Sequence, residues 1–358
     1  MENLEINPIL QKFKHKKIFL TGHTGFKGAW FAHLLLQIGA TVKGYSLYPK
    51  TEPSLFQLLN HHHKFESVFA DINHADVLEN HILSFQPDVI FHLAAQPLVR
   101  YSYHHTLETF QTNVIGTANL LEACKKLNKP CIVVCVTTDK VYSNKELRYA
   151  YNERDSLGGH DPYSASKAAA ELIIDSYRKS FFSEGHIQVA SARAGNVIGG
   201  GDWSEDRLIP DLVRSISLKK KMVIRNPSAV RPWQHVLDPI FGYMTLASNM
   251  MDVHHKFTSA WNFGPFNGEE KTVTEVANIF YQTFGMESDI SIEQDQQLHE
   301  ANLLMLDINK SQQHLLWKPT WNTERAIKET ALWYNELNSN NAEQLTNQNI
   351  HSFFSNEL

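Results

Sequence analysis

The chain has 358 residues, more than one hydrophobic core usually supports, so we expect one large domain with a smaller lobe beside it. With 42% hydrophobic residues, 20% charged residues and a formal charge of −5, it has no electrostatic reason to bind nucleic acid or an anionic membrane. The expected partner is therefore a small molecule.

The sequence also indicates where the protein works. No stretch approaches the ~20 uninterrupted apolar residues of a membrane helix, and the first seventeen residues lack the apolar core of a secretory signal. Three cysteines, Cys124, Cys131 and Cys135, lie around one apolar run and suit reduced core thiols better than disulfides. We therefore expect a cytoplasmic protein.

The first half of the chain alternates short apolar runs with amphipathic stretches. Strands are predicted at 17–21, 41–47, 67–70, 88–94, 131–138 and 187–194. Helices are predicted at 25–38, 74–85, about 106–127 and about 161–182. Strands that are apolar throughout and alternate with helices predict an α/β fold with a doubly wound parallel sheet of the Rossmann type.

The second half is punctuated by Gly, Pro, Trp and Arg, which predicts a smaller lobe that closes over a ligand. We expect the dinucleotide-binding domain over 15–195, with later segments returning to it. A smaller α/β substrate lobe is expected mainly over 196–335. Residues 336–358 are expected to be a polar tail with a frayed end, since they are rich in Asn and Gln.

A glycine motif, "TGHTGFKG", follows the first predicted strand directly. Gly22, Gly25 and Gly28 would let the backbone turn tightly, approach a pyrophosphate and pack the next helix on the sheet, while free N–H groups face the phosphates. The motif stands inside a βαβ unit, so it predicts dinucleotide binding rather than a simple tight turn. The residues assigned to the cofactor are Gly22, Thr24, Gly25, Phe26, Lys27, Gly28, Asp71, Ile72, Leu93, Ala94 and Ala95, together with Tyr163 and Lys167.

The acidic residue that normally accepts hydrogen bonds from the adenosine ribose of NAD is missing after the second predicted strand, where the chain reads "YSLYPKTEP". This leaves NAD expected but NADP open. Asp71 and Ile72, after the third strand, would hold the adenine; a strand-end Asp is as often a helix cap.

A second motif, "DPYSASKAAAEL", places Tyr163 and Lys167 four residues apart on one helix face. Thr138 ends the preceding strand and completes a set in which the Tyr acts as acid and base, the Lys lowers its pKa, and the Thr orients a substrate hydroxyl. An exposed Tyr and Lys on a helix surface is the alternative.

Taken together, the motifs resemble the extended short-chain dehydrogenase/reductases that act on nucleotide sugars, over about residues 15–335. They include "FHLAAQPLVR", "TTDKVY", "RAGNVIGGGDW", "RNPSAVRPWQHV" and "WNFGP". His23, Lys27, "RPWQHV" and the pair Asp139-Lys140 resemble most closely the branch of 4,6-dehydratases that act on CDP-glucose. Another nucleotide-sugar 4,6-dehydratase or an NAD-dependent 4-epimerase is the alternative, and a non-catalytic dinucleotide sensor fits poorly because the acid/base set is intact.

The resemblance implies that CDP-D-glucose becomes CDP-4-keto-6-deoxy-D-glucose and water. Tyr163 would take the proton of the C4 hydroxyl while NAD⁺ takes the C4 hydride. The C5 proton and the C6 hydroxyl then leave, and the hydride returns to C6. Lys140 would serve as the base at C5 and Asp139 as the acid at C6; an ion pair at the protein surface is the alternative reading of these two residues.

The resemblance also implies substrate contacts and a dimer. The residues assigned to the substrate are Gln96, Arg193, Asn196, Arg207, Arg231 and His299; Arg193 could equally be a buried ion-pair residue. The run "NHHHKF" at 60–65 is expected to be a solvated loop rather than a metal site. A homodimer is expected through a four-helix bundle of helices 106–127 and 161–182, with Leu120, Leu121, Leu172 and Ile173 as surplus apolar residues.

Overall fold

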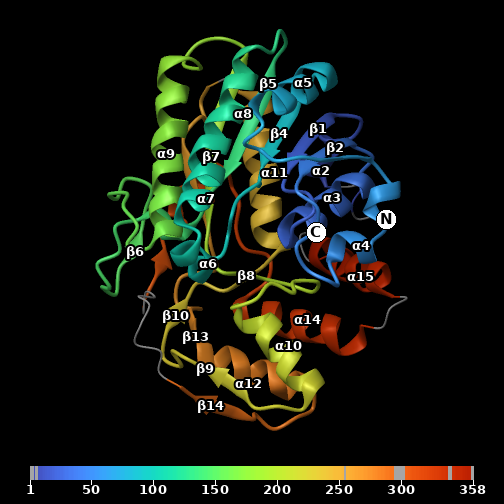
Figure 1. The fold of residues 1–358 in the computed structure, drawn as a ribbon, viewed down its shortest axis with the longest axis vertical. Coiled ribbons are helices and arrows are strands. Elements are labelled where there is room, and N and C mark those ends of the chain that lie inside the picture. Colours follow the sequence, from blue (N-terminus) through green and yellow to red (C-terminus); the bar gives the residue numbers. More distant parts are fainter. Residues whose placement is uncertain (1–3, 5–6, 254, 294–302, 338–340, 356–358) are drawn as a thin grey trace.

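The computed structural model describes residues 4, 7–253, 255–293, 303–337 and 341–355. A seven-stranded parallel sheet forms its centre (Figure 1). The strands in spatial order are β12 (Ala260–Phe263), β7 (Ile187–Ala194), β5 (Cys131–Val136), β4 (Val89–His92), β1 (Lys17–Thr21), β2 (Thr41–Ser46) and β3 (Glu66–Phe69). The predicted doubly wound fold is confirmed.

Helices cover both faces of the sheet, which explains why its inner strands are buried along almost their whole length. One core contains side chains of α3 (Phe26–Gln37) and α11 (Leu237–Asp252). The other contains side chains of α5 (Ala75–Phe85), α8 (Gly116–Lys125) and α9 (Pro162–Ser180). Cys124, Cys131 and Cys135 are buried free thiols in this second core. No helix in the described part of the chain has the length and apolar character needed to cross a membrane.

The smaller lobe lies beyond the carboxyl ends of the strands (Figure 1). It is built from α10 (Leu208–Leu218), α12 (Val273–Thr283) and α14 (Thr323–Glu336). Two short strand pairs accompany them, β9 (Met222–Ile224) with β14 (Ile290–Ile292) and β10 (Val230–Arg231) with β13 (Lys271–Thr272). Residues 237–263 leave this lobe and supply α11 and β12 to the large domain.

Short elements connect the two parts. The strand pairs are β8 (Val197–Ile198) with β11 (Gln234–His235), and β6 (Ala150–Tyr151) with β15 (Met305–Leu306). Elsewhere in the chain, the short helical elements are α2 (Pro8–Gln11), α4 (Leu55–Leu58), η1 (His61–His63), α6 (Val99–His104), η3 (Asp139–Val141) and α13 (Asn309–His314).

The helix predicted at 106–127 contains a wider turn. It runs as α7 (Thr106–Phe110), a π-helical turn η2 (Gln111–Ile115) and α8. The buried Asn113 in this turn accepts a hydrogen bond from the backbone N–H of Gln96 at 2.9 Å and donates one to Ser166 Oγ at 2.8 Å. The π turn therefore aims Asn113 at the loop after β4 and at α9.

The expectation of a frayed polar tail is wrong for residues 342–355, which form helix α15 (Ala342–Ser355). Although this helix is rich in Asn and Gln, it has an apolar face formed by buried side chains, which are Leu345, Ile350, Phe353 and Phe354. Asn347 accepts a hydrogen bond that joins α15 to Gln37 of α3, and Lys64 pairs with Glu343 at 2.7 Å. Composition alone concealed the helical spacing of these apolar residues.

Candidate active site

The glycine motif forms a tight turn between β1 and α3. Gly22 has a φ of 73°, and a Cβ there would lie 2.7 Å from the backbone nitrogen of Ala94. A Cβ on Gly28 would lie 2.0 Å from the carbonyl oxygen of Gly22. Only glycine allows this approach, so β1, the start of α3 and the residues after β4 meet closely enough to hold a pyrophosphate.

Hydroxyl and aromatic groups stand at the end of β2, where an acidic residue is missing. Thr24 Oγ1 lies 2.9 Å from Ser46 Oγ and donates to the carbonyl oxygen of Leu47. The exposed Tyr48 packs on Phe69 with ring centroids 5.2 Å apart. The adenosine end of a dinucleotide would therefore meet a hydroxyl pair and an apolar surface here.

The two residues assigned to adenine lie after β3. The carboxylate of Asp71 accepts a hydrogen bond from the N–H of Asn73 at 2.9 Å, as the turn-capping alternative requires. The side chain of Ile72 is buried against Gly116, where an added Cβ would lie 2.5 Å from Ile72 Cγ2. The hydroxyl of Tyr45 donates a hydrogen bond to the carbonyl oxygen of Asp71 at 2.9 Å, which holds the backbone of this turn beside the sheet.

Tyr163, Lys167 and Thr138 meet where α9 begins beside the end of β5. Asp161 caps the helix by accepting a hydrogen bond from the N–H of Ser164 at 2.9 Å. Both Tyr163 and Lys167 are buried, which contradicts the alternative of an exposed Tyr and Lys. Lys167 Nζ donates to the carbonyl oxygen of Val136 at 3.3 Å.

The protonation of this set is governed by burial. Burial raises the pKa of Tyr163 to about 12, an effect that a hydrogen bond from Thr138 opposes. Burial also lowers the pKa of Lys167 to about 8. A positive charge brought next to Tyr163 would lower the pKa of the phenol and make it a usable base.

Asp139 and Lys140 lie in the turn η3, directly after Thr138. Asp139 is fully buried, so the alternative of a surface ion pair is wrong. Its Oδ1 accepts from Thr138 Oγ1 at 3.0 Å and lies 3.3 Å from Lys140 Nζ. Lys140 also lies 3.4 Å from Asn196 Oδ1. Asp139 Oδ2 has no hydrogen-bond partner among the described residues and lies on the side of Gly195, where a Cβ would be 3.1 Å away.

A cluster of positive charge borders the same place. Lys27, in the first turn of α3, donates to the hydroxyl of Tyr243 on α11 at 3.1 Å. Burial, and then the charges of Arg207 and Lys167, lower the pKa of Lys27 to about 7. Arg207 itself donates to Asp202 at 2.8 Å. Such a cluster suits an anionic ligand that carries phosphates. Tyr243 was missed from the sequence, because nothing in its helix distinguishes it from a core tyrosine.

The residues assigned to the substrate separate into two groups. Arg193 belongs to the core rather than to a ligand site, because it is buried on β7 and pairs with Glu171 at 2.8 Å; its assignment to the substrate is wrong. Gln96 is also buried, and its side-chain amide donates to Thr109 at 2.9 Å and accepts from the Leu98 N–H at 2.6 Å. It orders the loop after β4.

Asn196, Arg207 and Arg231 lie nearer the second lobe. Asn196 reaches Lys140, and Arg207 stands among the charges around Tyr163. Arg231 is buried at the end of β10 and donates to the carbonyl of Val230 at 3.1 Å. His299 lies outside the described residues. Asn196 and Arg207 come from different parts of the chain and approach Lys140 and Tyr163 only in the folded protein.

Two of the histidines named from the sequence, His23 and His61, pack in the core. His23 is buried beside Gly44, where a Cβ would lie 2.5 Å from the imidazole ring. His61 is also buried and stacks on His33, so the expected solvated loop at 60–65 is wrong for this residue. Within the described residues, no group of His, Cys, Asp and Glu is arranged to hold a metal ion.

Comparison with known proteins places this geometry in context. The family model described as GDP-mannose 4,6 dehydratase matches residues 19–330. CDP-glucose 4,6-dehydratase of Salmonella typhimurium is 43% identical over 324 residues, which cover 89% of this chain and 90% of that protein. UDP-glucose 4-epimerase of Mycoplasma genitalium is 27% identical over 75% of this chain and 82% of that protein.

Solved structures share the fold. The dTDP-glucose 4,6-dehydratase of Bacillus anthracis in complex with NAD is 27% identical, with a TM-score of 0.75 over 92% of this chain and 99% of that one. The UDP-glucose 4-epimerase of Thermotoga maritima with UDP-glucose has a TM-score of 0.78 over 89% of this chain and 99% of that one. At 20% identity, the second likeness concerns the fold alone.

Proposed function

This chain belongs to the nucleotide-sugar 4,6-dehydratase family of the extended short-chain dehydrogenase/reductases, and we propose that it converts CDP-D-glucose to CDP-4-keto-6-deoxy-D-glucose and water. The 43% identity to a CDP-glucose 4,6-dehydratase, extending over nearly the whole chain, supports this substrate. Among the structural observations, the pair formed by the buried Asp139 and the partly exposed Lys140 beside Tyr163 carries the proposal, because elimination of water needs two proton carriers that a 4-epimerase does not need.

NAD is the cofactor of the proposed reaction, accepting a hydride from C4 of the sugar and returning it to C6. The chain fits such a group: Gly22 and Gly28 leave space that a side chain would fill, and Lys27 adds positive charge at the start of α3. We assign the cofactor to the glycine motif and to the ends of β2, β3 and β4. The hydroxyls of Thr24 and Ser46 replace the usual acidic residue.

In the first half of the reaction, Tyr163 removes the proton of the C4 hydroxyl, which Thr138 holds in place. Lys167 stabilises the phenolate through its charge. Oxidation at C4 gives a ketone, which makes the proton on C5 acidic.

In the second half, Lys140 takes the C5 proton and Asp139 donates a proton to the departing C6 hydroxyl. When the hydride returns to C6, Lys140 gives a proton back to C5. Asp139 Oδ2 suits this role, because it is buried and has no hydrogen-bond partner among the residues described. Lys140 Nζ and Asp139 Oδ1 lie 3.3 Å apart, so a proton can pass from one residue to the other between these steps. Asn196, Arg207 and Arg231 are the candidates for contacts to the sugar diphosphate.

The experiment that tests the function is incubation with NAD⁺ and a panel of glucose nucleotides that differ in the base. Product masses lower by one water, formed fastest from CDP-glucose, are expected. A product of unchanged mass with galactose configuration would identify a 4-epimerase instead. Fastest dehydration of another glucose nucleotide would keep the reaction and overturn the substrate.

Assembly as a homodimer is part of the proposal. Leu120 and Leu121 do not support it, because both are fully buried inside the large domain. Leu107, Ile115 and Leu172 support it instead, since their side chains remain exposed on α7, η2 and α9. A cytoplasmic location agrees with the three buried free thiols.

A further inference from the structure

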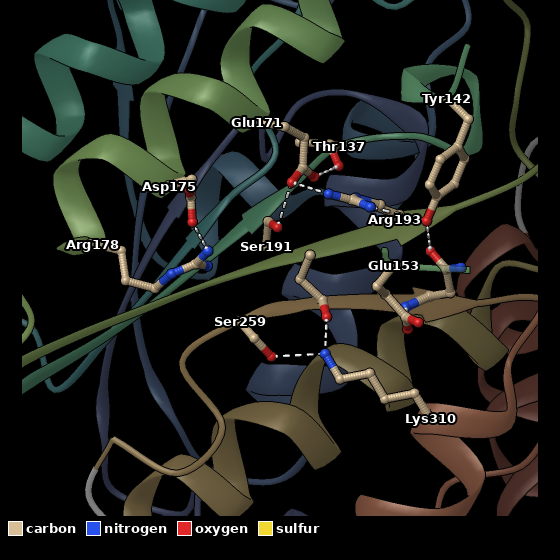
Figure 2. A network of polar contacts seen from close by, with 12 residues as sticks. Thr137, Tyr142, Glu153, Glu171, Asp175, Arg178, Ser191, Arg193, Ser259 and Lys310 are labelled. Carbon is tan, nitrogen blue, oxygen red and sulfur yellow. Dashed lines mark hydrogen bonds and ion pairs between the residues drawn. The ribbon is translucent and has the colours of Figure 1, made fainter. Parts of the chain in front are cut away.

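A buried ion pair lies beneath the proposed catalytic residues. Glu171 of α9 and Arg193 of β7 are each 4% exposed, and their charged groups lie 2.8 Å apart (Figure 2). Desolvating two charges costs much of what their attraction returns, so a buried pair is weak support for stability by itself. The hydrogen bonds that surround this pair indicate a positioning role.

The carboxylate of Glu171 joins three elements (Figure 2). Oε1 accepts a hydrogen bond from Thr137 Oγ1 at 2.5 Å, and Oε2 accepts one from Ser191 Oγ at 2.8 Å. Glu171 follows Lys167 by four residues and therefore lies on the same face of α9. Thr137 directly precedes Thr138. The hydrogen bond from Thr137 thus joins α9 to the residue that precedes Thr138, the cap of η3.

The guanidinium of Arg193 holds the other end of that turn. Nη1 donates to the hydroxyl of Tyr142 at 3.0 Å, and the charge lies 5.1 Å from the centre of the Tyr142 ring. Tyr142 in turn donates to Asn262 Oδ1 of β12 at 2.6 Å. The amide of Asn262 donates to the carbonyl oxygen of Tyr151 at 2.9 Å.

We propose that the Glu171–Arg193 pair is a brace that fixes the turn Asp139–Val141 against α9, with Thr137 and Tyr142 as its two points of attachment. The proposal rests on the proposed function, since it concerns the proton carriers of the elimination. Neither Glu171 nor Arg193 reaches the reacting atoms; both act through the residues that they position. The sequence signal was the Glu that follows Tyr163 and Lys167 in "YSASKAAAEL".

The brace predicts that the two halves of the reaction respond differently to Tyr142→Phe. This change removes the hydroxyl that accepts a hydrogen bond from Arg193 and leaves the hydrogen bond between Thr137 and Glu171. Tyr163 and Thr138 should therefore keep their positions, while Asp139 and Lys140 become less ordered. In a single turnover of CDP-glucose, elimination should slow by about 10-fold and oxidation at C4 by less than about 3-fold, since small misplacements of reacting groups are costly. Reduced cofactor should therefore accumulate.

Two controls belong to this experiment. Tyr177 lies on α9, like Glu171, and its hydroxyl donates to Glu122 at 2.6 Å. Tyr177→Phe removes this hydroxyl and should leave both steps unchanged. In a Lys140→Ala background, Tyr142→Phe should slow elimination by much less than it does alone, because the base that it positions is already gone.

A variant that separates folding from positioning replaces both charges, as Glu171→Met with Arg193→Met. Buried ion pairs often tolerate apolar replacement, so the cofactor-free protein should still unfold cooperatively on heating. Elimination should nevertheless slow at least as much as in Tyr142→Phe, because both attachments are lost. Cooperative unfolding with wild-type elimination would overturn the brace.

The last measurement does not depend on turnover. Backbone amides at 138–142 of the cofactor-free protein should exchange hydrogen faster in Tyr142→Phe than in wild type or in Tyr177→Phe. Unchanged exchange, or equal slowing of oxidation and elimination, would overturn the brace. Failure of the wild-type protein to dehydrate CDP-glucose would instead overturn the proposed substrate, and the brace would then be judged by the exchange measurement.

Discussion

Thr138, the residue that caps the turn after β5, lies beside the phenol of Tyr163 in the first turn of α9. In the sequence they are 25 positions apart, because a loop and β6 lie between them. In the folded protein they form one acid/base unit. Burial raises the pKa of the phenol to about 12, so its activity as a base depends on positive charge placed beside it.

Replacement of Tyr163 by Phe tests this unit. Turnover should fall by about 10²–10⁴-fold, the usual cost of losing a general acid or base. The affinity for CDP-glucose should change by less than about 3-fold, because the phenol acts in the transition state rather than in ground-state binding. Steady-state rates and calorimetric binding measure the two effects. An unchanged kcat would contradict the assignment, and Tyr281→Phe, in the second lobe, provides the control.

Buried histidines predict how stability depends on pH. Burial lowers the pKa of His23 to about 4 and the pKa values of His92 and His235 to about 3. In the unfolded chain these groups have a pKa near 6.5, so the unfolded state binds more protons as the pH falls below that value. The stability that their neutral forms contribute is therefore present above pH ~6.5 and is lost progressively between pH ~6.5 and the lowered values.

A single substitution makes the effect measurable. Each histidine that is neutral when folded and charged when unfolded contributes about 1.4 kcal/mol per pH unit to the slope of the unfolding free energy. His235→Phe should therefore flatten the slope between pH ~6 and pH ~4 by about one proton, whatever it does to stability at neutral pH. Urea denaturation at several pH values measures the slope. His351→Phe is the control on a half-buried histidine, and an unchanged slope in His235→Phe would contradict the prediction.

The sequence predicted the sheet well because its strands are buried on both faces and read as continuous apolar runs. It predicted that later segments return to the large domain but did not identify them as α11 and β12, since neither segment differs in composition from its neighbours in the second lobe. Arg193 was placed wrongly because a cation beside a binding loop and a cation in a core ion pair have the same local sequence. The tertiary partner, Glu171, decides between them.

The dimer has a prediction of its own. Leu172→Glu should weaken self-association by at least about 10-fold, because it places a charge where α9 exposes a large apolar side chain. Leu218→Glu is the matched control, with an equally exposed leucine, 63% against 62%, on α10 of the second lobe. Light scattering at micromolar concentration measures both. A monomeric wild-type protein, or equal dissociation of the two variants, would contradict the proposed interface.

The base at C5 is tested most directly through Lys140. If Lys140 takes the C5 proton, Lys140→Ala should still oxidise the sugar at C4 and then stall, because the ketone forms but the adjacent proton has no acceptor. The loss of a general base costs about 10²–10⁴-fold, so reduced cofactor should be visible in a single turnover. Lys140→Glu, which supplies a carboxylate in place of the amine, should recover part of the elimination. Lys145→Ala, an exposed lysine after the same turn, should behave as wild type.

Solvent deuterium distinguishes a base from a residue that only holds its neighbours in place. Wild type should introduce deuterium at C5, and Lys140→Ala should do so more slowly by the same factor as it eliminates water. If Lys140 served only to position Asp139, which it contacts at 3.3 Å, oxidation and elimination would slow together and no reduced cofactor would build up. Rapid C5 exchange in Lys140→Ala would show that another group removes this proton. Asp139 would then be the next candidate, because its Oδ2 is buried without a hydrogen-bond partner among the described residues.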